Sequence, residues 1–368
     1  MATSNSYVFG TTTQIDAFFR EAFERIGIEG NKISQPLVTS AQMSANLALT
    51  YWMGKGPNTW MRKRRMVSLY PNQATYQLPV NLSQIVDVIA IQPQRLNTNG
   101  NALSSAVASG SAANVFNPNT NVGCTLADPN GYFEFAYNQG YSYSIFYIGI
   151  QPLNDNSTYT LNVQYSFDGN NWITIYNGFS TTYNANQIGW IVVENSLNAQ
   201  YWRIVETGGA TLALQQLYFS QPTTNGSGDR ALSPYSYTEY MQIPNKQNNS
   251  ATGGYFFNSQ VNPYITLYPV PNQTYNALLY TGYFYPQDVT NLFNEFDLPQ
   301  RFLDALVAEL AYRLATKPTT AKLADVPIDA NTIARLQQDR DIAFSTAALT
   351  DESNFPLRMS PDFNYVGR

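Results

Sequence analysis

Residues 163–176 read VQYSFDGNNWITIY, two runs of aromatic and β-branched residues separated by Asp168-Gly169. Apolar residues at every second position are typical of strands, and Asp-Gly is a strong signal for a tight turn between two strands. We interpret Asp168-Gly169 as a hairpin turn that positions Trp172 in a core, in preference to a ligand site. The stretch therefore predicts an antiparallel β domain in the middle of the chain.

The same pattern continues on both sides of this hairpin. Short strands separated by turns are predicted throughout residues 131–219, and many short strands at close spacing indicate a β-sandwich. Two loose segments, at 96–121 and 221–230, have the composition of linkers and bracket these strands. We therefore predict that residues 96–229 form an all-β jelly-roll sandwich with flanking linkers, inserted into another domain.

The segments outside the insert predict four helices. Their apolar residues recur at helical spacing, and capping or breaking residues lie at their ends. In the second helix we expect the buried stripe to contain Met43, Leu47, Thr50 and Tyr51, and in the fourth we expect Asp329 to be the cap. The four segments are 12–27, 39–53, 297–318 and 329–351.

Strands are predicted between the second and third helices. Residues 64–79 read as two strands around a turn at 71–73, and residues 83–91, SQIVDVIAI, as a strand that is apolar on both faces and hence buried. After the insert, strands resume with YTEYMQIP at 237–244. The predicted fold class is a multidomain α+β protein. It comprises a discontinuous domain of residues 1–95 and 230–350, the inserted sandwich, and an extended C-terminal arm of residues 351–368.

Composition limits the chemistry of the chain. Charged residues are 12% of the sequence, about half the usual share, and the 27 tyrosines outnumber the 20 lysines and arginines. The net charge of −5 argues against a general nucleic-acid binder. No histidine is present, which excludes a Ser-His-Asp triad, and the single Cys124 excludes an internal disulfide. We expect no enzyme activity and neither a cofactor nor a metal.

The order of elements outside the insert resembles the head-to-tail adaptor (connector) proteins of short-tailed bacteriophages. The resemblance rests on YQLPVNLSQIVDVIAI at 76–91, YITLYPVPNQTYNALLYTGYFYP at 264–286 and DLPQRFLDALVAELAYRLA at 297–315. It implies an adaptor domain built on a four-helix bundle. It also implies a ring of subunits, expected to be dodecameric, that docks beneath the portal protein, meets tail or nozzle proteins and continues the channel through which double-stranded DNA is ejected.

The insert has a resemblance of its own. VQYSFDGNNWITIY, YWRIVE at 201–206 and LALQQLYFS at 212–220 are similar to strands of discoidin domains, in the galactose-binding-like superfamily. NVFNPNTN at 114–121 resembles an early turn of that family. There Asn117 and Pro118 replace the family's Asp and Gly, so the resemblance does not carry the family's structural calcium to this chain. It does imply a host or fibre carbohydrate as a further partner.

Two segments are candidate functional sites. Arg62, Lys63, Arg64 and Arg65 form an uninterrupted basic run, which a ring would repeat as a belt of positive charge. The belt would either face the lumen, where it would attract DNA phosphates without reading bases, or contact a neighbouring subunit. The C-terminal arm is too rich in apolar residues for a purely solvated tail. Its candidate portal-binding residues are Phe355, Pro356, Leu357, Met359, Phe363 and Tyr365.

We therefore expect a structural virion protein, located at the head-to-tail junction and synthesised in the host cytoplasm. The sequence shows no secretory signal, and its longest apolar stretches are too short to span a bilayer, so we expect no membrane insertion. The alternative is a carbohydrate-binding protein in which the sandwich binds glycans and the helices serve only to oligomerise it.

Overall fold

The computed structural model describes residues 15–54, 59–119, 122–178, 180–185, 187–194, 196–222, 229–272, 276–286, 288–289 and 298–351. Its contacts divide the chain into two compact units. The first consists of Met1–Lys63 and Tyr283–Arg368, and the second of Arg64–Gly282.

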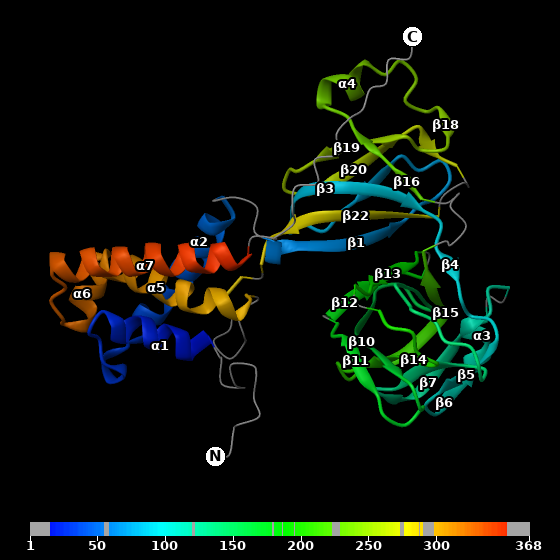
Figure 1. Cartoon of the computed structure of the whole chain (residues 1–368), viewed down its shortest axis with the longest axis horizontal. Coiled ribbons are helices and arrows are strands. Elements are labelled where there is room, and N and C mark those ends of the chain that lie inside the picture. The colour runs from blue at the N-terminus through cyan, green and yellow to red at the C-terminus, as the bar shows by residue number, and fades with distance from the viewer. Residues whose placement is uncertain are drawn as a thin grey trace, which may run out of the picture. The chain divides into compact units, whose positions relative to one another are not determined.

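The described part of the first unit is mostly helical (Figure 1). The central helix is α5, which contacts α1, α2 and α7 and buries nine of its thirteen residues. Aromatic rings fill the space around it, with Trp52 packed 6.0 Å from Phe302 and 5.3 Å from Phe344 between ring centroids. The helices are α1 (Ile15–Arg25), α2 (Gln35–Gly54), α5 (Leu303–Ala315), α6 (Pro318–Ala324) and α7 (Ala330–Asp351), with 3₁₀ turns at Gly30–Lys32, Thr59–Met61 and Gln300–Phe302.

The helical predictions hold except at two ends. α2 begins at Gln35, earlier than predicted, because Pro36 is tolerated in the first turn of a helix. The predicted third helix begins later, at Leu303 after the 3₁₀ turn, and it ends before Lys317-Pro318 as predicted. Pro318 opens a further helix, α6, which the sequence did not predict. Asp329 caps α7 as predicted, where its Oδ1 accepts a hydrogen bond from the backbone N–H of Thr332 at 2.8 Å. That these helices form the four-helix bundle of an adaptor stays a prediction.

The second unit contains two small four-stranded sheets. One has the order β1-β22-β3-β16 and the other β17-β19-β20-β2. Their strands are β1 (Arg62–Ser68), β2 (Thr75–Gln77), β3 (Leu82–Ile91), β16 (Arg230–Ala231), β17 (Ser233–Pro234), β19 (Gly254–Asn258), β20 (Tyr264–Tyr268) and β22 (Ala277–Phe284), and beside them β18 (Asn249–Ser250) pairs with β21 (Val270–Pro271).

Three strand predictions in this region are wrong. The strands of residues 64–79 do not pair with each other, because β1 pairs with the buried strand β22, and β2 pairs with β20 in the other sheet. β3 is not buried on both faces, since Val86 is 46% exposed. Residues 237–244 contain a helix, α4 (Tyr237–Gln242), because Ser236 and Glu239 form a capping box that satisfies two backbone N–H groups.

The β-sandwich predicted in the middle of the chain is confirmed. Its first sheet has the order β11-β10-β14-β8-β5, with β12 beside β10, and its second has the order β13-β9-β15-β7-β6, with β4 beside β15. The strands are β4 (Gln94–Arg95), β5 (Gly100–Ser104), β6 (Val107–Gly110), β7 (Cys124–Pro129), β8 (Tyr132–Tyr137), β9 (Tyr147–Pro152), β10 (Ser157–Ser166), β11 (Ile173–Tyr176), β12 (Ser180–Tyr183), β13 (Gly189–Val192), β14 (Tyr201–Glu206) and β15 (Thr211–Gln221).

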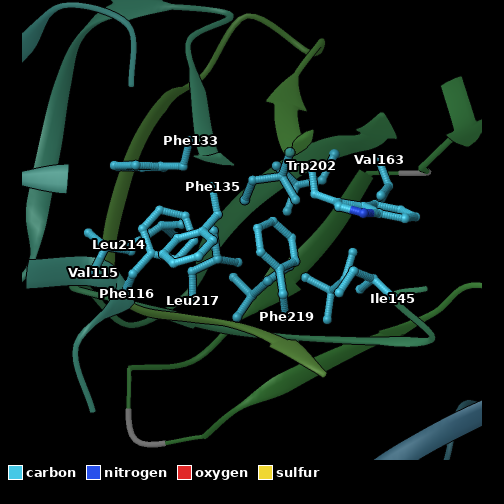
Figure 2. Close-up of a cluster of buried hydrophobic side chains, with 14 of the residues drawn as sticks. Val115, Phe116, Phe133, Phe135, Ile145, Val163, Trp202, Leu214, Leu217 and Phe219 are labelled. Atoms are coloured by element: carbon cyan, nitrogen blue, oxygen red, sulfur yellow. The ribbon is translucent and has the colours of Figure 1, made fainter. Parts of the chain in front are cut away.

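The predicted linker at 96–121 belongs largely to the sandwich. It supplies β5, β6 and the short helix α3 (Ala112–Phe116). Val115 and Phe116 of α3 are buried, and Figure 2 shows them beside Phe135 and Leu217 in the core. The small uncharged residues of this segment therefore form paired strands. Composition alone does not distinguish such strands from a flexible linker.

The sandwich lies between two strands that pair with each other. β3 leads into it and β16 follows it, and these strands are antiparallel neighbours with Arg230 opposite Ala90 and Ala231 opposite Ile89. The sandwich and this sheet also share a small core, in which Tyr147 packs with Met66, Ile91 and Leu279. The domain boundaries proposed above stay a prediction.

The core tryptophan of the sandwich is Trp202, and the expectation for Trp172 is wrong. Trp202 is fully buried, and its indole N–H is shared between the carbonyl oxygens of Tyr143 and Ala199, at 3.0 and 3.3 Å. Trp172 is only half-buried and stacks against Arg203, whose Cζ lies 3.9 Å from the ring centroid. Successive strand residues face opposite sides, so Arg203, next to Trp202, points outward and Trp172 shares its outer face.

We predict that Trp202→Phe destabilises the sandwich by ~2–4 kcal/mol, because it leaves a cavity and removes the hydrogen bonds of the buried indole N–H. The matched change Trp172→Phe, on the outer face, should cost less than ~1 kcal/mol. Urea unfolding of the two variants, followed by near-ultraviolet circular dichroism, measures both effects. Equal losses would show that Trp202 does not anchor the core.

Candidate functional site

The described residues contain no constellation typical of an enzyme. Within them, no group of three or more Cys, Asp or Glu residues could hold a metal ion. Cys124 is buried, and burial raises the pKa of its thiol, which disfavours the reactive thiolate. No helix in the described ranges is long and apolar enough to cross a membrane.

Helix α2 has an exposed apolar face. Its twenty residues, QPLVTSAQMSANLALTYWMG, include no Asp, Glu, Lys or Arg. Met43, Leu47 and Tyr51 recur every four residues and are 61, 51 and 45% exposed. These three residues, here called the α2 stripe, were expected in the core. The side of α2 that is buried instead carries mostly smaller residues, with Leu37, Ala41, Ala45, Ala48, Leu49 and Trp52.

Polar contacts hold the flank of α2 next to the α2 stripe. Lys317 Nζ donates hydrogen bonds to the carbonyl oxygen of Ser40 at 3.2 Å and to the hydroxyls of Ser40 and Ser44 at 2.9 and 2.7 Å. Burial and the charge of Arg313 lower the pKa of Lys317. These contacts tie α2 to the segment between α5 and α6.

A buried carboxylate organises the charges between α5 and α7. Glu309 is 2% exposed and pairs with Arg313, and Arg340 Nε lies 3.8 Å from its second oxygen. The guanidinium of Arg313 also lies over the ring of Tyr51, 5.4 Å from its centroid. A buried charge is stable when it is paired, and two arginines compensate Glu309. The charges near α2 thus have partners within the unit.

The predicted basic run forms the first half of β1. Its side chains alternate, with Arg62 and Arg64 exposed and Lys63 and Arg65 half-buried. The positive charge of Arg65 partly offsets the effect of burial, which raises the pKa of the buried Tyr183 and Tyr280. Two of the four residues are therefore available on the surface, and the role of the run in an assembly stays a prediction.

The predicted portal-binding residues Phe355, Pro356, Leu357, Met359, Phe363 and Tyr365 lie outside the described residues. Their role stays a prediction.

The Asp168 turn has the structural role that we expected. Oδ1 of Asp168 accepts hydrogen bonds from the backbone N–H groups of Asn170 and Asn171 at 2.9 and 2.8 Å, and from the Ser166 hydroxyl at 2.9 Å. These bonds hold the pKa of the carboxyl well below its usual value. Gly169 has a φ of +76°, which suits glycine in a tight turn.

Two adjoining loops of the sandwich carry a surface that the sequence did not single out. Tyr141 and Tyr143 stack with centroids 6.5 Å apart and planes at 18°, and Tyr141 is 46% exposed. The Ser144 hydroxyl donates a hydrogen bond to Asn198 Oδ1 at 2.7 Å, which ties the two loops together. The signal available in the sequence was the repeated aromatic pattern YSY at 141–143. The predicted strand of residues 143–150 included only its last residue, Tyr143.

Comparison with known proteins gives no family. No family model and no curated protein matches the chain. Among solved structures, the chain is similar to CpGH89CBM32-5 from Clostridium perfringens in complex with GalNAc-β-1,3-galactose, with 17% identity, 33% of this chain and 95% of that chain covered, and a TM-score of 0.29. It is also similar to chitosan-binding module 1 of a chitosanase/glucanase from Paenibacillus sp. IK-5, with 18% identity, 34% and 97% covered, and a TM-score of 0.28.

A third similarity is to CBM32-3 from a family 31 glycoside hydrolase of Clostridium perfringens, with 16% identity, 35% of this chain and 95% of that chain covered, and a TM-score of 0.30. Scores this low establish no ligand for this chain.

Proposed function

We propose that the protein is a structural component of a homo-oligomeric ring, the adaptor that joins the portal to the tail of a short-tailed bacteriophage and continues its DNA channel. The observation that carries this proposal is the α2 stripe. A surface helix of twenty residues normally carries charges on its solvated face, and α2 has none. A helix with an uncharged exposed face that carries a stripe of large apolar side chains is suited to a position between two subunits.

The energetics favour burial of the α2 stripe in an assembly. Full burial of a large apolar side chain is worth about 1.5–3 kcal/mol, and Met43, Leu47 and Tyr51 are each about half exposed in the single chain. Covering them would contribute roughly 1 kcal/mol apiece, before the cost of association. A ring repeats this contact at every subunit, so a modest contribution per interface supports a stable assembly.

Contact with DNA is proposed for the exposed half of the basic run. Arg62 and Arg64 alternate with half-buried neighbours on one strand, so a ring would repeat two outward guanidinium groups per subunit. Attraction of this kind acts on phosphates and is independent of base sequence, as a channel for any DNA requires.

Attachment to the portal is proposed for the C-terminal arm on the strength of its apolar composition.

Carbohydrate binding by the sandwich is the second candidate function. The observation that favours it is the stacked pair Tyr141 and Tyr143 beside the polar groups of Ser144 and Asn198. An exposed aromatic ring next to hydrogen-bonding groups offers a sugar both a face to stack on and partners for its hydroxyls. This function is compatible with a virion protein that also recognises a glycan.

We predict that Met43→Glu with Leu47→Glu prevents ring formation without unfolding the subunit, because both side chains already lie in solvent in the single chain. Circular dichroism checks the fold, and negative-stain images taken with the portal protein of the same phage check assembly. Val261→Glu is the matched control, since Val261 is 88% exposed and belongs to the other unit. Normal rings from the double variant would overturn the proposal that α2 forms the interface.

We predict that Arg62→Gln with Arg64→Gln spares assembly and lowers DNA retention in particles. The difference from wild type should shrink as salt rises, because screening weakens the attraction to phosphates. Lys32→Gln with Lys322→Gln removes two other exposed charges and should have no effect. Failure of the first variant to assemble would assign the basic run to a subunit interface instead.

We predict that Tyr141→Ala abolishes any glycan binding by the protein, with little change in its melting temperature. A glycan array probed with the full chain measures the first effect. Tyr237→Ala, at a tyrosine that is 63% exposed on α4, is the control and should bind as wild type does. An array without signal for the wild type would remove this second function.

A further inference from the structure

A cavity of about 330 Å³ lies where the sandwich meets the sheet that contains β1, within the second unit. Ser68 and Tyr70 line it from the end of β1, Arg95 from β4, Trp190 from β13 and Tyr218 from β15, and Asn276 closes it. Cavities of this size lie at the small end of the range for ligand sites in proteins. The described residues show no function for it in the assembly proposed above.

Hydrogen bonds hold one wall of this cavity in place. The indole N–H of Trp190 donates to Ser68 Oγ at 2.8 Å, and Ser68 Oγ donates to the carbonyl oxygen of Ile188 at 2.9 Å. The backbone N–H of Ile188 donates to the hydroxyl of Tyr70 at 3.3 Å. The wall therefore consists of oriented aromatic rings whose polar atoms already have partners.

Three planar groups follow one another across the cavity. The rings of Trp190 and Tyr218 have centroids 6.4 Å apart, with 31° between their planes. The guanidinium of Arg95 lies over the ring of Tyr218, with Cζ 4.0 Å from the ring centroid. An organic ligand in this cavity would thus meet apolar ring surface and one cation.

The charge of Arg95 has no carboxylate partner. Its Nη2 donates to the carbonyl oxygen of Phe116 at 2.8 Å, and Nε is buried and makes no hydrogen bond within the described ranges. No described Asp or Glu forms an ion pair with it. Burial lowers the pKa of Arg95 to about 10, partly offset by Tyr218. A half-buried cation with neutral neighbours destabilises the folded state unless an anion pairs with it.

Four other half-buried arginines each lie near a carboxylate. Arg25 pairs with Asp304, Arg313 and Arg340 pair with Glu309, and Arg203 lies near Glu134. Arg95 is thus an exception to the way in which this chain compensates such charges. The exception coincides with a cavity, which provides space for the missing anion.

We propose that this cavity binds a small organic carboxylate, whose carboxylate group pairs with Arg95 and whose body packs against Trp190 and Tyr218. A planar guanidinium matches a carboxylate with two parallel hydrogen bonds. A single positive charge, without lysines or a helix N-terminus among the lining residues, suits one negative charge better than a phosphate's two. A free acid and a Glu side chain of another chain present this same carboxylate group, and two probes distinguish them.

Titration calorimetry and thermal shifts on the full chain test this proposal with two probes. Benzoate represents a free aromatic acid, and N-acetyl-glutamic acid α-amide represents a glutamate side chain. At least one should bind and raise the melting temperature, and the stronger of the two identifies the source. Benzamide, which has the shape of benzoate without its charge, should bind at least tenfold more weakly than benzoate.

Arg95→Gln should weaken binding of the preferred probe at least tenfold, and Arg95→Lys should restore part of it. Arg203→Gln is the matched control, because Arg203 also stacks on an aromatic ring of the sandwich, and it should bind the probe as wild type does. If Arg95→Gln does not fold, competition between benzoate and benzamide on the wild type still decides. Failure of both acids to bind the wild type, or equal binding of benzoate and benzamide, would overturn the proposal.

Discussion

The pairing of β3 with β16 is the constraint on which the second unit depends. It places the chain's exit from the sheet, at Ile89 and Ala90, beside its return, at Arg230 and Ala231. An insertion with its two ends held close together costs little loop entropy, so a whole sandwich can lie between neighbouring strands. The same pairing holds the sandwich against the sheet, where Tyr147 covers Met66, Ile91 and Leu279. The cavity beside Arg95 exists only because these two parts meet.

A low content of charge explains several features together. A chain with 12% charged residues cannot solvate its surface with ions alone, so tyrosines and uncharged polar groups cover much of it. The buried carboxylate of Glu309 has two partners, Arg313 and Arg340. Against this background, an uncharged helix with an exposed apolar face and an arginine without a carboxylate are informative. Each marks a surface that is suited to contact with another molecule.

Errors in the strand and helix predictions have a common origin. A period of two in residues 64–79 correctly indicated strands, but their partners β22 and β20 come from the distant segments around 264–284. The run YTEYMQIP has strand-forming residues, and the capping box of Ser236 and Glu239 outweighs that preference. Small uncharged residues at 97–116 pair at sheet edges or form α3 instead of a linker. In each case a specific partner decided what composition left open.

By itself the sequence determined the central β-sandwich, the helices on either side of it, the Asp168 turn and the absence of histidine chemistry, because these follow from local periodicity, turn residues and composition. Tertiary structure alone decided which face of α2 is buried, that Trp202 rather than Trp172 fills the core, and that Arg95 borders a cavity. Periodicity distinguishes the two faces of a helix or strand, but it does not show which face packs against the rest of the protein. That choice depends on contacts such as those of Lys317 with Ser40 and Ser44, between residues far apart in the chain.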